Sequence, residues 1–206
     1  MIFEQRLTEA CLEDRTVAGM FEARKQVFVD LLKWDLPVLN GRFEIDQFDD
    51  RHACYLIVAD TDGVHLGSTR ILPSEREHIL GGLFPDLCNS GVPTGAGIAE
   101  ITRFCLGRNQ NAAERRHTRN RLVSAIVRHA IINDIHLYTG VAEYGWLQQI
   151  LAFGWNCRPL GPPQRFAGAL LGALAIEIGE DTPALLAANG IWVEEAPAVM
   201  PALEAA

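Results

Sequence analysis

The apolar residues of this chain change their spacing several times, and this alternation constrains the fold more than any other feature. Apolar side chains recur at helical spacing in Thr16–Lys33 and in Thr118–Asn133. By contrast, Ile98–Leu106 and Ile135–Val141 are short apolar runs that are typical of strands. Helical and extended segments therefore follow one another along the chain, which favours an α/β fold.

A β-hairpin is predicted where Asp60-Thr61-Asp62-Gly63 separates the apolar runs Cys54–Ala59 and His65–Leu72, because Gly63 can adopt the positive φ of a tight turn. We expect one mixed sheet with helices on both faces, a three-layer αβα sandwich that forms a single domain over residues 1–206. Its later elements are a helix, two strands and a short helix, at Glu143–Phe153, Trp155–Leu160, Ala169–Ile178 and Pro183–Ala188.

Composition and charge exclude two classes of protein. Hydrophobic residues make up 49% of the 206 residues, which excludes intrinsic disorder of the whole chain. The net charge is −8, which argues against general nucleic-acid binding. Yet residues 101–130 contain seven arginines and one acid, Glu114. This local excess suggests an acidic partner, although a solvated helix face explains it equally well.

The five cysteines are scattered, which predicts free and mostly buried thiols in a reducing compartment: Cys11, Cys54, Cys88, Cys105 and Cys157. Neither the cysteines nor the histidines have the spacing of metal ligands, so we expect no metal. The first residues lack the pattern of a signal peptide, and Phe166–Ile178 is too short to cross a bilayer. We therefore expect a cytoplasmic protein.

Polar residues occur where a pattern that only builds a core would not place them. Arg24 and Phe28 are four residues apart and share a helix face. Trp34 follows Phe28 by six residues. A run of acids precedes the hairpin, at Glu44, Asp46, Asp49 and Asp50. Each group alone also fits a plain role on the surface or in a solvated loop.

The apolar strand Ile98–Leu106 contains Glu100 and Arg103, and Arg70 lies in a similar strand. Glu100 and Arg103 are three residues apart, an odd number, so on a regular strand their side chains point to opposite faces of the sheet. A β-bulge between them would change this. Glu100 could also pair with an arginine of a neighbouring strand.

Taken in order, these residues resemble the motifs of the acyl-homoserine-lactone synthases, the autoinducer synthases of bacterial quorum sensing. The resemblance runs from about Arg24 to Leu160. It implies a fold like that of the GCN5-related N-acetyltransferases. The matching residues are Arg24, Phe28 and Trp34; Glu44, Asp46 and Asp49; Arg70-Ile71-Leu72-Pro73; Phe84; and Glu100, Arg103 and Phe104.

By this resemblance, the chain joins S-adenosylmethionine to an acyl group carried on an acyl carrier protein or on coenzyme A. No cofactor is expected, because S-adenosylmethionine is a substrate. Glu100 and Arg103 are the candidate catalytic residues, with Glu100 either the base that deprotonates the amine or a support for Arg103. The implied S-adenosylmethionine site consists of Arg24, Phe28, Trp34, Asp46, Asp49, Arg70, Phe84 and Phe104.

The chemistry of these side chains suits that ligand. Carboxylates and aromatic faces favour a sulfonium cation, which suggests Asp46, Asp49, Trp34 and Phe28 as its surroundings. The carboxylate of the ligand requires a cation, for which the candidates are Arg24, Arg70 and Arg103.

The acyl donor has its own candidate residues. The resemblance suggests Thr139 as a residue that influences the acyl chain, and Trp146 could line an apolar tunnel. An acidic carrier protein would be attracted to Arg115, Arg116, Arg119 and Arg121. The loop Arg108–Ala113 lacks the central glycine with which the related acetyltransferases bind pyrophosphate, which favours the carrier protein over coenzyme A.

Two other classes of function remain. One is an N-acyltransferase of the same fold that uses acyl-coenzyme A and another amine. The other is a non-catalytic protein that binds acyl groups. The joint presence of the motif residues argues against an inactive copy.

Overall fold

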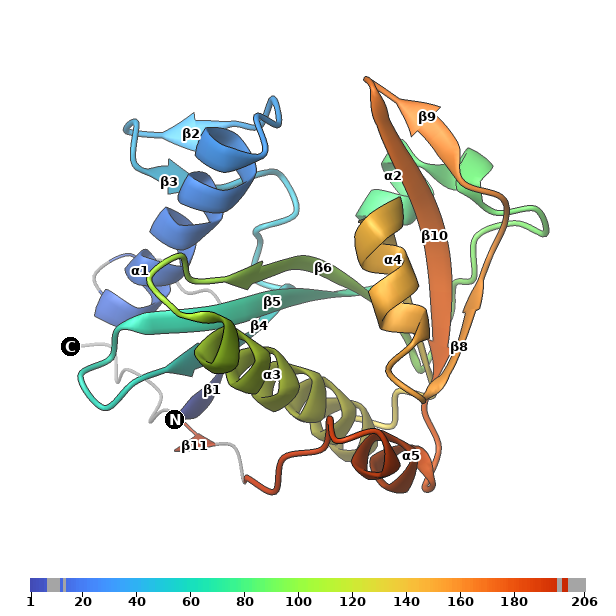
Figure 1. The fold of residues 1–206 in the computed structure, drawn as a ribbon. Helices are drawn as coiled ribbons and strands as arrows, with labels where there is room; N and C mark the ends of the chain where they lie inside the picture. Colours follow the sequence, from blue (N-terminus) through green and yellow to red (C-terminus); the bar gives the residue numbers. More distant parts are fainter. Residues whose placement is uncertain (7–11, 13, 196–197, 200–206) are drawn as a thin grey trace. The chain divides into compact units, whose positions relative to one another are not determined.

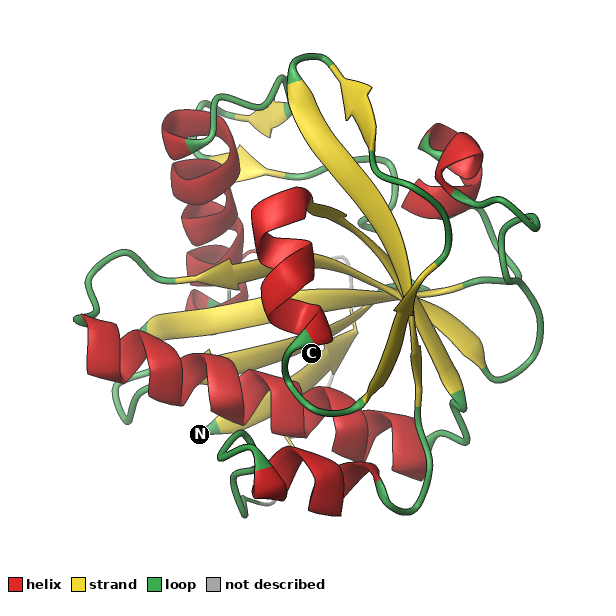
Figure 2. Ribbon diagram, turned by 45° about the vertical axis from the view of Figure 1, so that its right-hand side comes forward, coloured by secondary structure: helices red, strands yellow, loops and turns green. Residues whose placement is uncertain are grey.

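The computed structural model describes residues 1–6, 12, 14–195 and 198–199. The chain divides into two compact units. Unit 1 comprises Met1–Arg70, Arg103–Leu122 and Glu194–Ala206, and unit 2 comprises Ile71–Thr102 and Val123–Val193. Both units combine strands with helices (Figure 2). We describe each unit separately.

The sheet of unit 1 has the strand order β11-β1-β4-β5. Strand β1 (Ile2–Arg6) pairs antiparallel with β4 (Cys54–Ala59) and parallel with β11 (Ala198–Val199). Strand β5 (His65–Pro73) contributes its residues up to Arg70 to this unit. Every residue of β4 is buried, which explains why its sequence reads as a continuous apolar run.

Unit 1 contains helical segments from early in the chain and part of a later helix (Figure 1). Helix α1 (Arg15–Arg24) continues directly into a π-helix, η2 (Lys25–Leu31). The short strands β2 (Val38–Leu39) and β3 (Phe43–Glu44) then pair as a separate two-stranded sheet. The first half of α3 (Ala112–Ile132) completes the unit.

The strands of unit 2 follow one another in the order β6-β7-β10-β8, and β6 contributes its residues up to Thr102 to this unit and the rest to unit 1. Strand β6 (Ile98–Leu106) pairs parallel with β7 (Leu137–Glu143), and the other pairs are antiparallel. The remaining strands are β10 (Ala169–Glu177), β8 (Asn156–Pro159) and β9 (Gln164–Phe166). The helices are α2 (Ile79–Leu83), the 3-10 turn η3 (Pro85–Leu87), α4 (Tyr144–Leu151) and α5 (Thr182–Ala188).

The structure confirms the predicted α/β class with a mixed sheet. The hairpin and the strand at Ile98–Leu106 occur where they were predicted. At the turn of the hairpin, Gly63 has a φ of 76°, and the Asp60 carboxylate accepts hydrogen bonds from the backbone of Asp62 and Val64. The short elements β1, β2, β3, α2, β9 and β11 were not predicted, because segments this short carry little periodicity.

The predicted start of the long helix was wrong. Helix α3 begins at Ala112, six residues before Thr118, because Asn111 caps it. The Asn111 side chain accepts hydrogen bonds from the backbone N–H groups of Ala113 and Glu114, at 2.9 and 3.1 Å. In return, the Glu114 carboxylate accepts from the Asn111 N–H at 2.8 Å. This reciprocal pair is a capping box, and it allows a polar segment to start the helix.

Of the predicted free thiols, Cys54 and Cys105 are buried and Cys88 and Cys157 are half-buried, and none of these four forms a disulfide. Cys11 lies outside the described residues. Among the described helices, none is long and apolar enough to cross a membrane.

The capping box gives a direct test of the fold. Replacing Asn111 by alanine removes the acceptor for two backbone N–H groups, so we expect the free energy of unfolding to fall by about 0.5–2 kcal/mol. Urea denaturation measures this change. Asn109 is exposed two residues earlier, so Asn109→Ala is the matched control and should leave stability unchanged. Equal stability of both variants and the parent chain would contradict the role of the cap.

Candidate functional site

A buried network of three arginines and three carboxylates lies in unit 1. Arg24 pairs with Glu44 at 2.5 Å and with Asp49 at 2.7 Å. Arg70 pairs with Asp46 at 2.6 Å and with Asp49 at 2.7 Å. Arg103 pairs with Glu44 at 3.1 Å and with Asp46 at 2.6 Å. Each carboxylate therefore contacts two arginines, and the formal charges of the six groups cancel.

Four regions that are separated in the sequence supply these side chains. Arg24 is the last residue of α1, and Glu44 ends β3. Asp46 and Asp49 lie in a turn that the backbone closes by a 3.0 Å hydrogen bond from the Asp49 N–H to the Asp46 carbonyl. Arg70 extends from β5, and Arg103 comes from β6. The charged residues of the acidic run at 44–49 and of strands β5 and β6 thus form one cluster with Arg24.

Asp49 is the most heavily bonded member of the network. Its two oxygens accept from both terminal nitrogens of Arg24, from the Asp46 N–H at 2.8 Å and from the Tyr55 hydroxyl at 2.7 Å. Arg70 lies 2.7 Å from the same carboxylate. Burial alone would raise the pKa of Asp49, but the charge of Arg24 and its hydrogen bonds, followed by Arg70, hold that pKa well below its ordinary value. Asp49 is therefore ionised and surrounded by protein donors.

Exposure separates the inner members of the network from the outer ones. The side chains of Arg24, Arg70, Glu44 and Asp49 are at most 1% exposed. Asp46 is 5% exposed and Arg103 is 8% exposed. Of the six charged groups, Asp46 and Arg103 are thus the two that a ligand can reach with the least rearrangement.

An aromatic pair adjoins the outer edge of this network. The rings of Phe28 and Trp34 stack with centroids 5.0 Å apart, and the Arg103 guanidinium lies 5.6 Å from the centre of the Phe28 ring. The π-helix η2 carries Phe28, and the Trp34 N–H donates to the Phe28 carbonyl at 2.9 Å. Phe28, Trp34, Asp46 and Arg103 therefore lie together within unit 1.

Arg103 has an unusual backbone conformation. Its φ is 52°, in the left-handed region that non-glycine residues rarely adopt. The regular alternation of side chains along β6 is therefore interrupted at this residue. Local strain of this kind often marks functional positions.

Glu100 is the centre of the candidate residues in unit 2. It is fully buried, and its two oxygens accept from the backbone N–H groups of Ile79 and Leu80, at 2.8 and 2.9 Å. Its register partner on the parallel strand β7 is Thr139, which is also fully buried. The Thr139 hydroxyl has no hydrogen-bond partner among the described residues.

The two candidate aromatic residues of unit 2 lie in apolar surroundings. Phe84 packs against a buried cluster that includes Leu80 and Leu87, and its ring meets that of Phe166 edge to face at 5.1 Å. Trp146 on α4 contacts Phe153 in the same manner at 5.8 Å. Phe84 was predicted in the S-adenosylmethionine site, but its described contacts are those of an apolar core. Phe104 is half-buried on β6 in unit 1.

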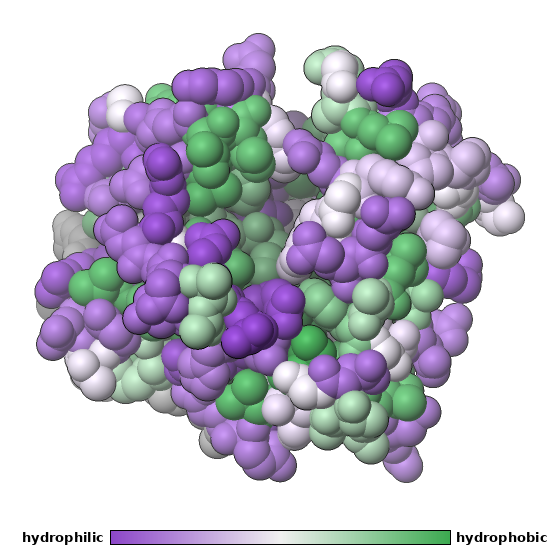
Figure 3. Space-filling view, viewed as in Figure 1, coloured by the Kyte–Doolittle hydropathy of each residue, from purple (hydrophilic) through white to green (hydrophobic). Residues whose placement is uncertain are grey.

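The four arginines predicted to dock a carrier protein differ in their surroundings. Arg116 is exposed, whereas Arg115 and Arg119 are half-buried. Arg115 donates to the Gly107 carbonyl at 2.9 Å, and Arg119 bonds the Asn120 side chain. Arg121 is 9% exposed and holds Glu195 through two 2.7 Å hydrogen bonds. The first turns of α3 nevertheless present a hydrophilic surface (Figure 3).

Two residues of the network were given no role by the sequence. Glu44 belongs to the acidic motif, but only the structure shows that it joins Arg24 and Arg103. Tyr55 sits in the apolar strand β4, where it was indistinguishable from a core residue. The only indication in the sequence was the hydroxyl of a tyrosine within an apolar strand, because a buried hydroxyl requires a hydrogen-bond partner.

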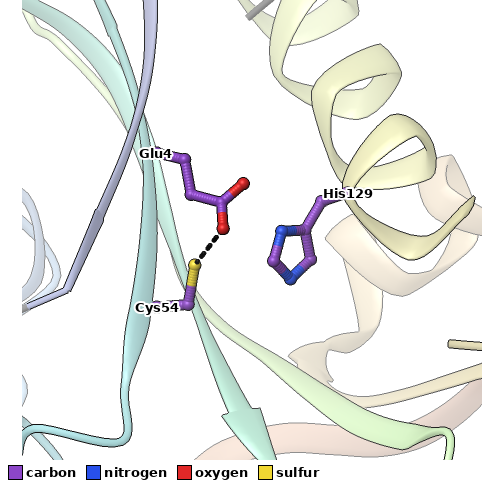
Figure 4. Close-up of side chains that lie close together, drawn as sticks. All are labelled: Glu4, Cys54 and His129. Atoms are coloured by element: carbon purple, nitrogen blue, oxygen red, sulfur yellow. Dashed lines mark hydrogen bonds between the residues drawn. The ribbon is translucent and has the colours of Figure 1, made fainter. Parts of the chain in front are cut away.

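The thiol of Cys54 has little tendency to ionise, so it is a poor nucleophile. Burial, followed by the negative charge of Glu4, raises its pKa to about 12. The thiol donates to the Glu4 carboxylate at 3.6 Å (Figure 4). His129, also drawn there, belongs to unit 2. Cys54 is therefore no candidate nucleophile.

Comparison with known proteins bears on these residues. The family model described as autoinducer synthase matches residues 9–144. An acyl-homoserine-lactone synthase of Ralstonia nicotianae is 29% identical over 195 residues, which cover 91% of this chain and 95% of that protein. One from Aliivibrio fischeri is 32% identical over 128 residues, or 61% of this chain and 66% of that protein.

Solved structures share the fold. BjaI, a coenzyme A-dependent acyl-homoserine lactone synthase solved with S-adenosylmethionine and isopentyl-coenzyme A, has a TM-score of 0.85 at 23% identity, over 99% of this chain and 95% of that one. An acyl-coenzyme A N-acyltransferase from Pseudomonas aeruginosa has a TM-score of 0.55 at 14% identity, over 85% and 98%. The expected likeness to N-acetyltransferases is therefore confirmed.

The match to the family model and to the curated relatives defines this chain as an acyltransferase of the class to which the resemblance pointed. The chain belongs to the autoinducer synthase family, as an enzyme of the acyl-homoserine-lactone synthase class.

The network makes stability depend on pH in a defined direction. The pKa of Asp49 is lower in the folded state than its ordinary value near 4, so its contribution is complete above about pH 4 and is lost as the pH falls further. Asp49→Asn removes one of the two carboxylate partners of Arg24 and of Arg70 and leaves one buried positive charge uncompensated, so we expect a loss of about 3–5 kcal/mol at pH 7. Urea titrations at pH 7 and pH 3 should show a smaller loss at pH 3.

Asp35→Asn is the matched control, because Asp35 is exposed in the same unit. It should change stability by less than about 0.5 kcal/mol at either pH. A loss that is the same at both pH values for Asp49→Asn would show that the ionised carboxylate contributes nothing.

Proposed function

We propose that this enzyme makes an acyl-homoserine lactone from S-adenosylmethionine and an acyl thioester. The amine nitrogen attacks the thioester carbonyl, an amide forms, and the thiol leaves. The methionine carboxylate then attacks its own γ-carbon, and the C–S bond breaks with its electron pair leaving on methylthioadenosine. Because the sulfonium becomes a neutral sulfide, the second step has a good leaving group. We further propose that no cofactor takes part.

The observation that carries this proposal is the pairing of Asp46 and Arg103 at the edge of the buried network, next to the stacked rings of Phe28 and Trp34. S-adenosylmethionine has two cationic groups and one carboxylate. A carboxylate and an aromatic face attract the cations, and a guanidinium attracts the anion. The inner residues Arg24, Arg70 and Asp49 would support this edge without touching the ligand.

Glu100 is our candidate for the base that takes the proton from the amine, directly or through a water. Both of its oxygens accept a backbone N–H, which fixes the position of the carboxylate. Its other possible role is to support Arg103, which Glu44 and Asp46 also hold.

The acyl donor that we propose is an acyl carrier protein. The N-terminus of α3, where the related acetyltransferases hold pyrophosphate, is occupied by its own capping box, and the Glu114 carboxylate adds a negative charge there. Free N–H groups and a positive end are what make a helix N-terminus bind phosphate. Here the N–H groups of Asn111, Ala113 and Glu114 are already bonded, and the Glu114 carboxylate would repel a phosphate.

The carrier protein would dock on the exposed basic surface of α3, with Arg116 as its centre and Arg115 and Arg119 beside it. Arg121 is left out, because it is buried and already holds Glu195. For the acyl chain we propose Thr139 and Trp146. The unpartnered Thr139 hydroxyl beside Glu100 favours a chain that brings an oxygen to this point.

We also propose that residues 1–206 act as one catalytic domain, in the cytoplasm. Two outcomes would replace the main proposal: an N-acyltransferase would acylate another amine without releasing methylthioadenosine, and a binding protein would turn nothing over.

Product analysis tests the reaction. With S-adenosylmethionine and an acyl thioester, the parent chain should release methylthioadenosine and an acyl-homoserine lactone in equal amounts, as followed by mass spectrometry. Glu100→Gln should lower kcat by roughly 10²–10⁴ and remove the acidic limb of the pH profile. It should also cost about 1–3 kcal/mol of stability, because its amide opposes a backbone N–H. Acylation without methylthioadenosine would contradict the proposal.

Donor kinetics test the carrier. We expect a higher kcat/KM for acyl carrier protein than for the same acyl group on coenzyme A, and a rise in KM for the carrier at 0.5 M salt, because ions screen the attraction. Arg116→Ala should raise this KM, whereas the exposed Arg165 of β9 gives a matched control, Arg165→Ala, that should not. A salt-independent KM, or a preference for coenzyme A, would overturn the choice of donor.

A further inference from the structure

Tyr55 is a buried tyrosine whose hydroxyl is aimed at the ionic network. Its side chain is fully buried in β4, and its ring packs edge to face on Phe21 at 6.0 Å. The hydroxyl donates to Asp49 Oδ1 at 2.7 Å. A tyrosine at this position therefore supplies both core volume and one directed hydrogen bond, and only the second distinguishes it from phenylalanine.

The protonation states of the two groups favour this hydrogen bond. Burial, followed by the charge of Asp49, raises the pKa of Tyr55 above its ordinary value, so the hydroxyl keeps its proton at neutral pH. Asp49 is ionised there because the arginines lower its pKa. The hydroxyl is therefore the donor and the carboxylate the acceptor.

The contact extends through shared atoms to the outer edge of the network. Asp49 Oδ1, the oxygen that Tyr55 bonds, is also 2.7 Å from Nη1 of Arg70. The same Nη1 donates to Asp46 Oδ1 at 2.6 Å. Two hydrogen bonds and the ion pair between them therefore lead from the Tyr55 hydroxyl to Asp46. A shift of Asp49 Oδ1 would move Arg70 and, with it, the carboxylate at the exposed edge.

We propose that Tyr55 is a positioning residue for the S-adenosylmethionine subsite, which acts through Asp49 and Arg70 on the orientation of Asp46. This inference rests on the proposed function. Tyr55 touches no ligand. It limits the positions that the Asp49 carboxylate can take, so that Asp46 meets a cationic ligand already oriented.

Tyr55→Phe tests the proposal, because it removes the hydroxyl and keeps the ring. We expect the Kd for S-adenosylmethionine, measured by calorimetry, and its KM to rise about five- to tenfold, the effect of losing one hydrogen bond to a charged group. The KM for the acyl donor and kcat should change less than about twofold. A residue that only stabilises the fold would lower Tm without this separation of the two KM values.

Tyr138→Phe is the matched control. Tyr138 is also fully buried, its hydroxyl meets the Ile126 carbonyl at 3.4 Å, and it lies in unit 2. This variant should lower Tm but leave the Kd for S-adenosylmethionine unchanged. If Tyr55→Phe behaves in the same way as Tyr138→Phe, Tyr55 is structural only and the proposal is wrong.

A second variant covers the case in which Tyr55→Phe does not fold. Phe21→Leu keeps the hydroxyl but loosens the ring that Tyr55 packs against, and it should raise the Kd for S-adenosylmethionine by about two- to threefold. An unchanged Kd here would also overturn the proposal. Failure of the proposed function is distinguishable, because then the parent chain itself would neither bind S-adenosylmethionine nor release methylthioadenosine.

Discussion

The buried network of ion pairs between three arginines and three carboxylates is the constraint on which unit 1 depends. Ions withdrawn from water are tolerated only when each is paired and hydrogen-bonded. Here every carboxylate contacts two arginines, and the partners come from α1, β3, a turn, β5 and β6. Displacement of any one segment would take a partner from at least one buried charge and leave the charges of the network unbalanced in a low-dielectric interior. The network therefore fixes the relative positions of segments that the chain separates by up to 79 residues, from Arg24 to Arg103.

The network has inner residues that bond only to the protein and outer residues that a ligand can reach. Asp49 uses its oxygens on Arg24, Arg70, the Asp46 backbone and Tyr55, so its lone pairs are committed to the protein. Asp46 and Arg103 are more exposed and adjoin an aromatic pair. A carboxylate and a guanidinium that are held from behind can meet a charged ligand without reorganising, which is the physical basis of preorganised binding. Membership of the autoinducer synthase family agrees with such a site.

Particular residues show how far sequence reasoning reached. Strand β6 was predicted with its observed bounds, because a charged pair inside an apolar run still leaves a strand pattern. The start of α3 was missed, because Asn111 and Glu114 form their capping box within a segment that has no apolar periodicity. Arg121 looked like part of a basic surface, yet it is buried against Glu195, 74 residues away in the chain. The role of Tyr55 depended on a contact with Asp49 that β4 gives no sign of.

The sequence alone determined the α/β class, the hairpin, the motif residues and the family, since these depend on local periodicity, turn chemistry and ordered spacing. Only the tertiary structure decided which charges pair, which of them stay accessible, and how Arg103 leaves the regular alternation of its strand with a φ of 52°. The reason is physical. Periodicity places a side chain on one face of its own element, but the free energy of a buried charge depends on partners from other elements, and the fold brings those together.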